Sequence, residues 1–348
     1  MNAQFSAPPS LRYPFAAPPQ PGHRLEVAPG VYWLHFPLPF ALDHINLWLL
    51  ADGDGWTLVD TGFGSHHTRD IWASVFEHAL EGKPIRRILV THYHPDHIGQ
   101  AAWLAERFQA PVLMTRDEWA LTRRIHTATD TEINDELRAF FGLHGLAGEA
   151  LDTLASRGNG YRKAMPALPP EPTFIAGGDS LTINGETWRI LIGRGHAPEH
   201  ACLYRPRDTL LISGDQVLPK ISSNLSVRAH HPDEDAVGQF TSSLKAIKAA
   251  LPEQTLVLPA HGLPFHGLHA RVDALCDHHE EQLAAALQAC QAQPTTAFDL
   301  LPVLFRRELD SFQMLFAMSE SIAHLNGLMA RGLVQREQRQ GCLYFSAP

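Results

Sequence analysis

Apolar runs separated by glycine, aspartate and proline mark the first part of the chain. The segments GVYWLHF, INLWLLA and WTLVD join β-branched and aromatic residues between turn residues, which predicts successive strands of a sheet. A helical repeat of apolar residues follows in HHTRDIWASVFEHAL, and then come the strand RRILV and a further helix in GQAAWLAERF. The chain is therefore expected to open with a β-rich region and then to alternate strands with helices.

The apolar pattern becomes helical between about residues 116 and 165, in WALTRRIH and INDELRAFFGLHG, before the proline-rich ALPPEP. We interpret this stretch as a helical insertion, of a kind that often forms a lid. Strands resume in TWRILI, ACLYRP, TLLISGD and TLVLPA, with the helix DAVGQFTSSLKAIKAAL before the last. Basic side chains of the insertion are expected on a solvated face and its large aromatic ones in the core. The basic residues are Arg116, Arg123, Arg124, Arg162 and Lys163, and the aromatic ones are Trp119, Phe140 and Phe141.

The last part of the chain, residues 270–348, has helical patterns in ARVDALCDHHEEQLAAALQACQA, TTAFDLLPVLF and QMLFAMSESIAHLNGLMARG, and a hairpin pattern in LVQREQRQGCLYF. Three helices and a hairpin resemble a winged helix. This part carries six arginines and nine acidic residues, a balance that favours packing, dimerisation or covering of a pocket over nucleic-acid binding. His278 and His279 are neighbours on a helix and point in different directions, so we expect them on a solvated face.

Composition narrows the class of protein. With 348 residues, 45% of them hydrophobic, the chain can form one large domain and a smaller one. A net charge of −9 gives no overall basic field for nucleic acid or an anionic membrane and favours a small-molecule substrate. Four scattered cysteines indicate neither a disulfide framework nor a thiolate zinc site, and together with an N-terminus that lacks a signal-peptide pattern they favour the cytoplasm. No segment has the length and apolar character of a membrane span.

The segment THYHPDHIG places His92, His94, Asp96 and His97 on the loop between a strand and a helix. Alternate residues of an extended chain point the same way, so His92 and His94 can share a cation, while Asp96 and His97 lie at the turn into the helix. Imidazole and carboxylate ligands suit zinc, manganese or iron(II), and two such ions close together can activate one hydroxide. The loop therefore predicts part of a two-metal site.

Further residues of ligand type stand at later strand ends: His196 in GRGHAPEH, Asp215 in LISGDQ and His261 in LPAHG. Taken singly, such a histidine is usually a surface or hydrogen-bonded residue, and an aspartate beside glycine is usually a turn residue. The specific signal is the cluster from His92 to His97, because random composition seldom supplies four ligands at this spacing on a strand-to-helix loop.

The motifs THYHPDHIG, LVDTG, GHAPEH, SGDQ and PAHG follow one another as they do in metallo-β-lactamase-fold hydrolases, and residues from about 25 to 270 resemble that family. The resemblance implies an α/β fold, an αββα sandwich. It also implies a first metal site of His92, His94 and His196, a second of Asp96, His97 and His261, and Asp215 as the bridge between them. Asp60 would support the metal loop and orient a ligand histidine, although DTG alone is equally an ordinary turn. His200 would lie near the site without binding metal.

The aspartate at position 215 is similar to that of glyoxalase II and the RNA-processing members rather than to zinc β-lactamases. The motif GHAPEHACLY with SGDQVLP resembles the branch that includes β-lactamase-like protein 2, whose members carry a small winged-helix domain. We therefore expect a proline-rich arm over residues 1–24, a catalytic domain over residues 25–269 with the insertion at about 116–165, and a winged-helix-like domain over residues 270–348.

The leading functional hypothesis is hydrolysis of an acyl bond in a small molecule, either a thioester or a lactone or related ester. A hydroxide held between two divalent metal ions would attack that bond, with Zn²⁺ favoured and Mn²⁺ or Fe²⁺ as alternatives. Asp96 and Asp215 are the expected catalytic carboxylates. The first alternative is a phosphodiesterase or endoribonuclease that uses the basic residues of the insertion, and the second is a non-catalytic metal-binding sensor. A small molecule is the expected partner, nucleic acid and membrane are disfavoured, and a homodimer is compatible with the C-terminal domain.

Overall fold

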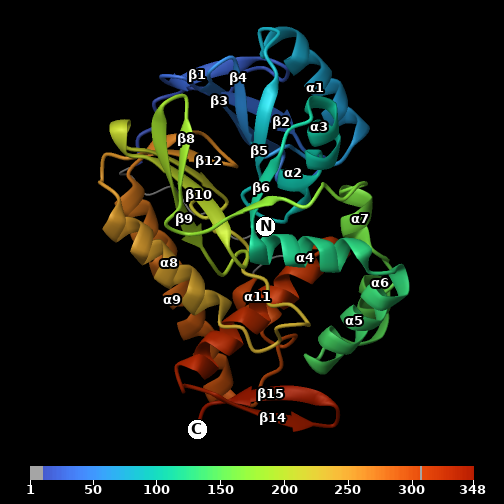
Figure 1. Ribbon diagram of the computed structural model, residues 1–348. Helices are drawn as coiled ribbons and strands as arrows, with labels where there is room; N and C mark the ends of the chain where they lie inside the picture. Colours follow the sequence, from blue (N-terminus) through green and yellow to red (C-terminus); the bar gives the residue numbers. More distant parts are fainter. Residues whose placement is uncertain (1–10, 306–307) are drawn as a thin grey trace.

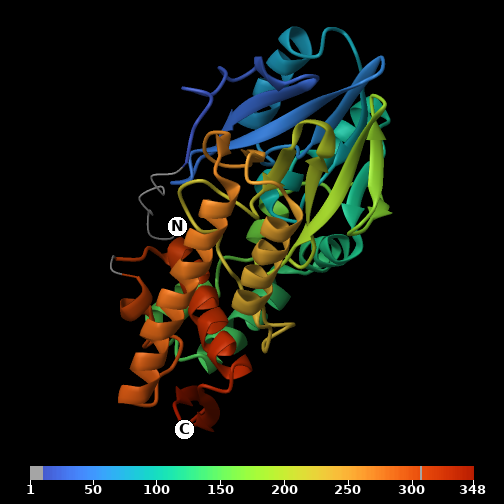
Figure 2. The ribbon, with the colours of Figure 1, turned by 90° about the vertical axis from the view of Figure 1, so that its left-hand side faces the viewer.

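A computed structural model describes residues 11–305 and 308–348. Two large sheets pack face to face and helices cover their outer faces, as Figures 1 and 2 show. The first sheet has the strand order β1-β2-β3-β4-β5-β6-β7, antiparallel as far as β4 and parallel beyond it. Its strands are β1 (Arg24–Ala28), β2 (Val31–Pro37), β3 (His44–Asp52), β4 (Gly55–Val59), β5 (Ile85–Leu89), β6 (Val112–Thr115) and β7 (Thr173–Ile175).

The second sheet has the order β13-β12-β11-β10-β9-β8 and is antiparallel except between β11 and β12. Its strands are β8 (Ser180–Ile183), β9 (Glu186–Gly193), β10 (His200–Arg205), β11 (Leu210–Gly214), β12 (Leu256–Pro259) and β13 (Phe265–His266), with a short 3-10 helix, η1 (Pro206–Asp208), between β10 and β11. The predicted α/β sandwich is confirmed, since both sheets are mixed and both lie between helical layers.

Alternation along the strands explains the layers. In β2 and β3, Trp33 and Trp48 point into the core between the two sheets, whereas Leu34 and Leu47 point into the core under the helices of the first sheet. A strand buried on both faces reads as a continuous apolar run, and both faces of these strands are covered. The helices on that side are α1 (His66–His78), α2 (Pro95–Ile98) and α3 (Ala101–Phe108).

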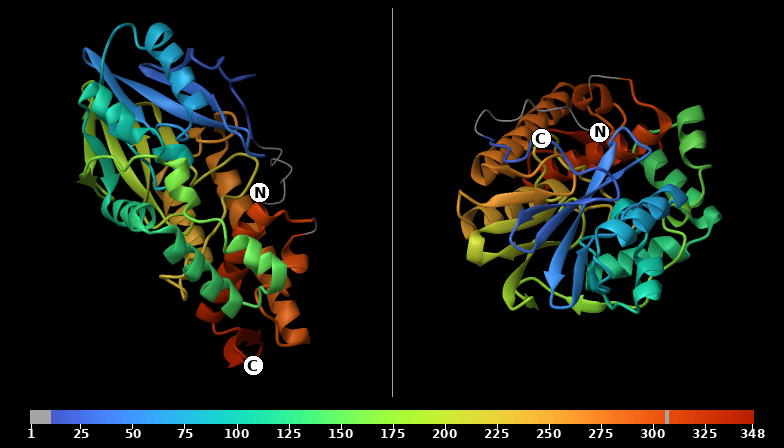
Figure 3. Two further views of the ribbon diagram at one scale, coloured as in Figure 1. Left: turned by 90° about the vertical axis from the view of Figure 1, so that its right-hand side faces the viewer. Right: turned by 90° about the horizontal axis from the view of Figure 1, so that it is seen from above.

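The helical insertion lies between β6 and β7 and consists of α4 (Arg116–Thr127), α5 (Asp130–Leu143), α6 (Gly148–Leu154) and α7 (Gly160–Ala164). Thr129 and Glu132 form a reciprocal capping box that starts α5. Figure 3 shows the insertion, in green, beside the red C-terminal elements, where α6 packs against α11 and α5 against β15. The predicted core positions of Trp119, Phe140 and Phe141 are confirmed, since all three side chains are buried.

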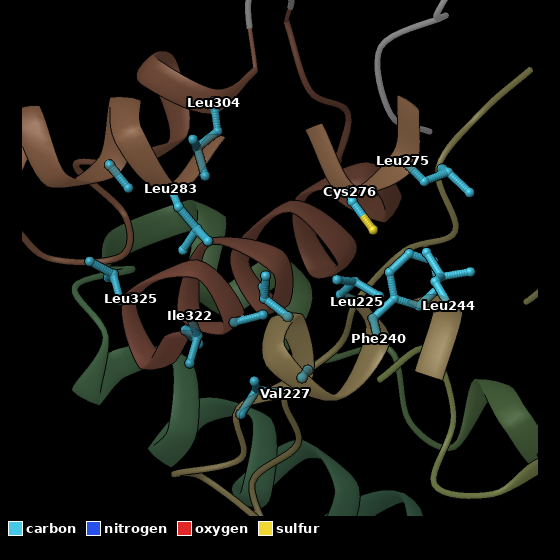
Figure 4. Close-up of a cluster of buried hydrophobic side chains, with 14 of the residues drawn as sticks. Leu225, Val227, Phe240, Leu244, Leu275, Cys276, Leu283, Leu304, Ile322 and Leu325 are labelled. Atoms are coloured by element: carbon cyan, nitrogen blue, oxygen red, sulfur yellow. The ribbon is translucent and has the colours of Figure 1, made fainter. Parts of the chain in front are cut away.

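The second sheet is covered by α8 (Ala236–Ala250) and α9 (Leu268–Ala292), and the chain ends with α10 (Leu301–Leu304), α11 (Ser311–Ala330) and the hairpin of β14 (Gln335–Arg339) and β15 (Cys342–Ser346). Figure 4 shows side chains from α8, α9 and α11, among them Phe240, Leu283 and Ile322, in one buried cluster. The C-terminal segment therefore shares a core with the elements that cover the second sheet.

Two expectations for this segment are wrong in detail. The predicted helix in TTAFDLLPVLF is only the four residues of α10, because Thr296 and Asp299 bond reciprocally in a turn ahead of it. His278 and His279 are not on a solvated face: both are buried, because α9 packs against α8 and α11 together and neighbouring positions on it are covered.

The N-terminal arm is described from residue 11 onward, and residues 1–10 lie outside the described part. Arg12 pairs with His266 of β13 through two backbone hydrogen bonds, and the Tyr13 ring lies 6.5 Å from that of Phe265. The described part of the arm is therefore attached to the second sheet. All four cysteines are free thiols. Within residues 11–305 and 308–348, no helix combines the length and apolar character that crossing a bilayer requires.

Candidate metal centre

Seven residues of ligand type converge at one end of the sandwich, where the loops after several strands meet. They form two groups. The first ligand group is His92, His94 and His196, and the second ligand group is Asp96, His97 and His261, with Asp215 within reach of both. We call all seven the metal centre.

Asp215 follows β11 and lies between the two groups. Its Oδ2 is 3.3 Å from Nε2 of His196 and 3.9 Å from Nε2 of His92, while its Oδ1 is 3.4 Å from Nε2 of His97 and 3.3 Å from Nε2 of His261. Each carboxylate oxygen thus faces one ligand group. This is the arrangement that a carboxylate bridging two metal ions requires.

The first ligand group joins two loops that are far apart in sequence. His92 Nε2 lies 2.8 Å from His94 Nδ1 and 3.2 Å from His196 Nε2. His92 and His196 are buried, and His94 is partly exposed. The three nitrogens surround a common point, so one cation can bind all three.

The second ligand group joins the start of α2 to the loop after β12. Asp96 Oδ2 lies 3.5 Å from His261 Nε2 and 3.7 Å from His97 Nε2. Both histidines are buried, whereas the Asp96 side chain is 20% exposed. The open side of the metal centre therefore lies at His94 and Asp96.

The donor set fits two divalent ions. Within the described residues, Nε2 of His97, Nε2 of His261 and Oδ1 of Asp215 are buried atoms without a hydrogen-bond partner. Buried polar atoms are seldom left without a partner, and these three face one another across the second ligand group. Histidine nitrogens with carboxylate oxygens are a donor set that zinc, manganese and iron(II) accept.

The ring nitrogens that point away from the metal centre are held by other partners. Nδ1–H of His196 donates to the Asn224 carbonyl at 2.8 Å, and Nδ1–H of His261 donates to the His44 carbonyl at 2.6 Å. These bonds fix the tautomer and leave each Nε2 lone pair for a metal. Asn224 and His44 were missed from the sequence because a backbone carbonyl acts here, which no residue type reveals.

Asp60 follows β4 and supports the loop that carries the histidine cluster. Its Oδ2 accepts from Nδ1–H of His97 at 2.8 Å, and its Oδ1 accepts from the backbone N–H of Thr91 at 2.8 Å. Its backbone has φ +61°, in the left-handed region that aspartate tolerates better than most residues. Asp60 therefore holds the His97 ring and the start of the histidine loop through hydrogen bonds.

His200 begins β10 and lies beside the metal centre without facing it. Its ring stacks on His92 with centroids 4.8 Å apart, and its Nε2 accepts from the backbone N–H of Asp215 at 3.0 Å. Burial lowers the pKa of His200 to about 3, so the ring is neutral and can accept this bond. A Cβ atom at Gly214 would lie 2.4 Å from His200 Nε2, which explains the glycine before Asp215.

Histidines of the two ligand groups have pKa values shifted in opposite directions. Burial lowers the pKa of His92 and His94 well below the ordinary value, and neighbouring histidines lower it further. Burial also acts to lower the pKa of His97 and His261. At His97 the charges of Asp60 and Asp215 outweigh burial, and at His261 the charge of Asp215 does, so the pKa of each histidine is raised. Burial would raise the pKa of Asp215, yet His261 and His97 hold it well below its usual range. Asp215 is therefore an anion in a site that favours positive charge.

The basic residues of the insertion are exposed, as the sequence predicts: Arg116, Arg123, Arg124, Arg162 and Lys163. Arg124 pairs with Glu136 at 2.6 Å, Arg162 pairs with Asp130 at 3.1 Å, and the Arg116 guanidinium stacks on Phe174. Lys163 donates to the Arg157 carbonyl at 3.2 Å, so four of the five cations are engaged with neighbours in the chain.

Comparisons with known proteins support the reading of these motifs. Residues 41–261 match the family model described as the metallo-beta-lactamase superfamily, and residues 283–348 match a metallo-beta-lactamase-like C-terminal domain. A crystal structure of a beta-lactamase domain protein from Burkholderia ambifaria is 41% identical, with a TM-score of 0.91 over 97% of this chain and 98% of that one.

Two curated relatives are more distant. The Bacillus subtilis protein named "Probable metallo-hydrolase YqjP" is 22% identical over 90% of this chain and 96% of its own length. An atrochrysone carboxyl ACP thioesterase from Aspergillus fumigatus is 23% identical over 67% of this chain but only 41% of its own length. The assignment to the branch of β-lactamase-like protein 2 and the domain limits stay predictions. The family match spans most of the two sheets and all seven residues of the metal centre, so the chain belongs to the metallo-β-lactamase superfamily and is a metal-dependent hydrolase.

Proposed function

We propose that this chain hydrolyses an acyl bond in a small molecule, a thioester or else a lactone or related ester, at a dinuclear metal centre. The observation that carries the proposal is the position of Asp215, whose two oxygens each face one ligand group. Two divalent ions, for which zinc is the preferred candidate, would supply an activated water and would stabilise negative charge on the carbonyl oxygen. A metal-binding sensor without catalysis would not need an open side at the centre.

The side chains divide the remaining work. Asp215 is buried and ionised, so its carboxylate can bind a metal ion through each oxygen and hold the two ligand groups at a fixed separation. Asp96 is the more exposed carboxylate and lies at the open side beside His261. It is therefore the group that can move a proton between the reacting water and solvent. Substrate enters past His94 and Asp96, because the other five residues of the centre are buried.

Acyl transfer is favoured over phosphodiester cleavage by two observations. The thioesterase from Aspergillus fumigatus is one of the relatives, although this chain spans less than half of its length. The basic residues of the insertion are solvent-exposed, and Arg124 and Arg162 pair with carboxylates of the insertion itself. In an RNA-binding surface, such cations would instead be free to contact phosphate groups. The role of the C-terminal domain as a homodimer contact and a cytoplasmic location remain expectations from the sequence.

The test combines metal analysis with a substrate panel. We expect close to two metal ions per chain by elemental analysis, together with turnover of thioesters or lactones but not of bis-p-nitrophenyl phosphate. Asp215→Asn should lower the turnover by a factor of about 10³ or more, because it removes the anion shared by the two ligand groups. Asp54→Asn is the matched control, since Asp54 is an exposed aspartate that pairs with Arg86 at the surface.

Three results would contradict the proposal. Turnover of the phosphodiester alone would move the assignment to a phosphodiesterase. Full metal content without turnover of any ester would favour a binding protein. A chain that takes up no metal would remove the basis of the mechanism.

A further inference from the structure

The first turn of the helical insertion contacts both loops of the first ligand group. We define the first metal loop as residues 91–99 and the second metal loop as residues 194–200. Glu118 lies in the first turn of α4, and its side chain is fully buried. Its Oε2 accepts from the backbone N–H of Tyr93 at 2.8 Å, and its Oε1 accepts from the backbone N–H of Glu199 at 2.8 Å. One carboxylate therefore joins the two loops.

The two residues that Glu118 holds are close to metal ligands in sequence. Tyr93 stands between His92 and His94, and Glu199 stands three residues after His196. Moving either backbone group by a fraction of an ångström would move the imidazoles attached next to it. Among the described residues, the hydrogen bonds of Glu118 go to backbone groups beside the ligands, and its charge also acts on His196.

The carbonyl groups of the same two residues are also held from the insertion side. The Tyr161 hydroxyl of α7 donates to the Tyr93 carbonyl at 2.6 Å, and the Thr115 hydroxyl at the start of α4 donates to the Glu199 carbonyl at 2.9 Å. Both polar backbone groups of Tyr93 and of Glu199 are thus bound by side chains of α4, α7 and the residue before α4. This arrangement fixes position and orientation together.

The carboxylate of Glu118 accepts strong hydrogen bonds, but burying a carboxylate costs free energy. Hydrogen bonds from N–H groups to a carboxylate are shorter and stronger than neutral ones. A buried carboxylate is costly unless it is paired: burial raises the pKa of Glu118 to about 7, while its two backbone donors and the positive charge of Arg228 act in the opposite direction. Leucine or methionine would fill the same volume without that cost, so a carboxylate at this position indicates a use for its two acceptors.

We propose that Glu118 is a positioning residue of the metal centre: it holds the first and second metal loops at the separation at which His92, His94 and His196 bind one metal ion together. The inference rests on the proposed dinuclear hydrolase. It assigns the helical insertion a role in building the first ligand group.

The geometry makes the expected effect unequal between the two metals. The first ligand group takes ligands from both loops that Glu118 joins, whereas the second takes Asp96 and His97 from the first loop and His261 from a loop that Glu118 does not touch. A backbone bond also ties the first metal loop to β10, directly after the second metal loop, from the Ala201 N–H to the Thr91 carbonyl at 2.9 Å. Loss of Glu118 should therefore loosen the first ligand group without separating the loops.

The experiment measures zinc binding by the full chain. Purified holoprotein is equilibrated with zinc buffers of decreasing free Zn²⁺, and bound zinc per chain is counted for wild type, Glu118→Gln and the control Glu132→Gln. Glutamine keeps the shape of Glu118 but turns an amide donor toward one of the two N–H groups. Glu132 is the control because it lies in the same insertion and caps α5 at the surface. We expect Glu118→Gln to bind one zinc ion as wild type does and to bind the other about 10-fold or more weakly, the size typical of groups that orient ligands.

A second pair of variants identifies which metal weakens. Combined with His261→Gln, which damages the second ligand group, Glu118→Gln should reduce the remaining zinc affinity further. Combined with His94→Gln, which damages the first, it should add little. Equal loss of both metals, or unchanged zinc binding in a folded Glu118→Gln protein, would overturn the inference.

Tyr161→Phe keeps the inference open to refutation if Glu118→Gln does not fold. It removes one hydroxyl bond to the Tyr93 carbonyl and should weaken the same zinc ion by a smaller factor, about 3-fold, since one neutral hydrogen bond is lost instead of a charged one. Unchanged zinc binding in Tyr161→Phe would then count against the inference. These readouts need no substrate, so wild type that binds two zinc ions but hydrolyses no ester would refute the proposed function while leaving this inference in place.

Discussion

Among the described residues, two buried clusters of histidines differ in their hydrogen bonding, and one of the two has the arrangement of a metal site. The metal centre combines five histidines with two carboxylates, and several of its ring nitrogens face a common point. The C-terminal histidine cluster consists of His278, His279 and His324, from α9 and α11. Among the residues that the structure describes, it is not one of the groups able to hold an ion.

Hydrogen bonding explains the difference between the clusters. In the C-terminal cluster, His279 bonds through Nε2 to the Ser222 hydroxyl at 2.9 Å and lies 3.4 Å from His324 Nε2 through Nδ1, while His324 Nδ1–H donates to the Glu320 carbonyl at 2.8 Å. These nitrogens are partners to one another along a chain. In the second ligand group, Nδ1 of His97 and of His261 is bonded to a group outside the centre, whereas the inward-facing Nε2 atoms of both rings have no hydrogen-bond partner among the described residues. The density of histidines therefore does not identify a metal site, whereas unpartnered nitrogens facing a carboxylate do.

The largest expected effect is a loss of zinc binding when a histidine of the metal centre, but not one of the C-terminal histidine cluster, is replaced. His196→Gln should remove one of three nitrogens from the first ligand group and weaken zinc binding there by about 100-fold or more. His279→Gln is the matched substitution in the other cluster and should leave the zinc content at the wild-type value. Elemental analysis after dialysis against a zinc buffer measures both. Loss of zinc in folded His279→Gln would mean that the clusters are coupled and that the contrast drawn above is wrong.

A second substitution tests the partners of the ring nitrogens. Asp60→Asn should weaken zinc binding at the second ligand group by 10-fold to about 100-fold, because the amide can no longer accept all three bonds that hold His97 and Thr91. Stepwise competition with a chelator gives the affinity. His324→Gln, which alters the hydrogen-bond chain of the C-terminal cluster, serves as the comparison and should bind zinc as wild type does. If Asp60→Asn also retains full affinity, the orienting role of Asp60 fails.

The smallest effect concerns acid. Burial lowers the pKa of His324 to about 4, well below the ordinary 6.5, so the unfolded chain takes up this proton before the folded one does. The contribution of the neutral His324 ring to the free energy of unfolding is complete above about pH 6.5 and is lost as the pH falls toward 4. One pKa unit corresponds to about 1.4 kcal/mol, so the loss is at most a few kcal/mol. Denaturant unfolding of wild type and His324→Gln at pH 7 and pH 5 should show a smaller decrease in the free energy of unfolding for the variant. An equal decrease would show that His324 is not buried as a neutral ring.

The sequence predicted the types of the ligands and their loops because both follow from local pattern. Strand-length apolar runs that end in HxHxDH, GH, GD and AHG place ligand side chains on loops, and the apolar runs of β2 and β3 predicted strands. A turn that precedes a proline, as in TTAFDLLPVLF, was less predictable, because reciprocal side-chain caps compete with the helical pattern.

Tertiary structure alone decided which nitrogens meet and which groups support them. His92 and His196 are separated by 104 positions and lie 3.2 Å apart only because β5 and β9 end at the same edge of the sandwich. His278 and His279 were predicted to face solvent because the sequence of one helix does not show which other helices pack against it. In the structure, two helices cover these residues. Glu118 carries no motif, and its two backbone contacts arise from loops distant in sequence. The local sequence determines which side chains an element carries and in which direction each one points from it. The burial and the partners of a side chain depend on which other elements pack against it.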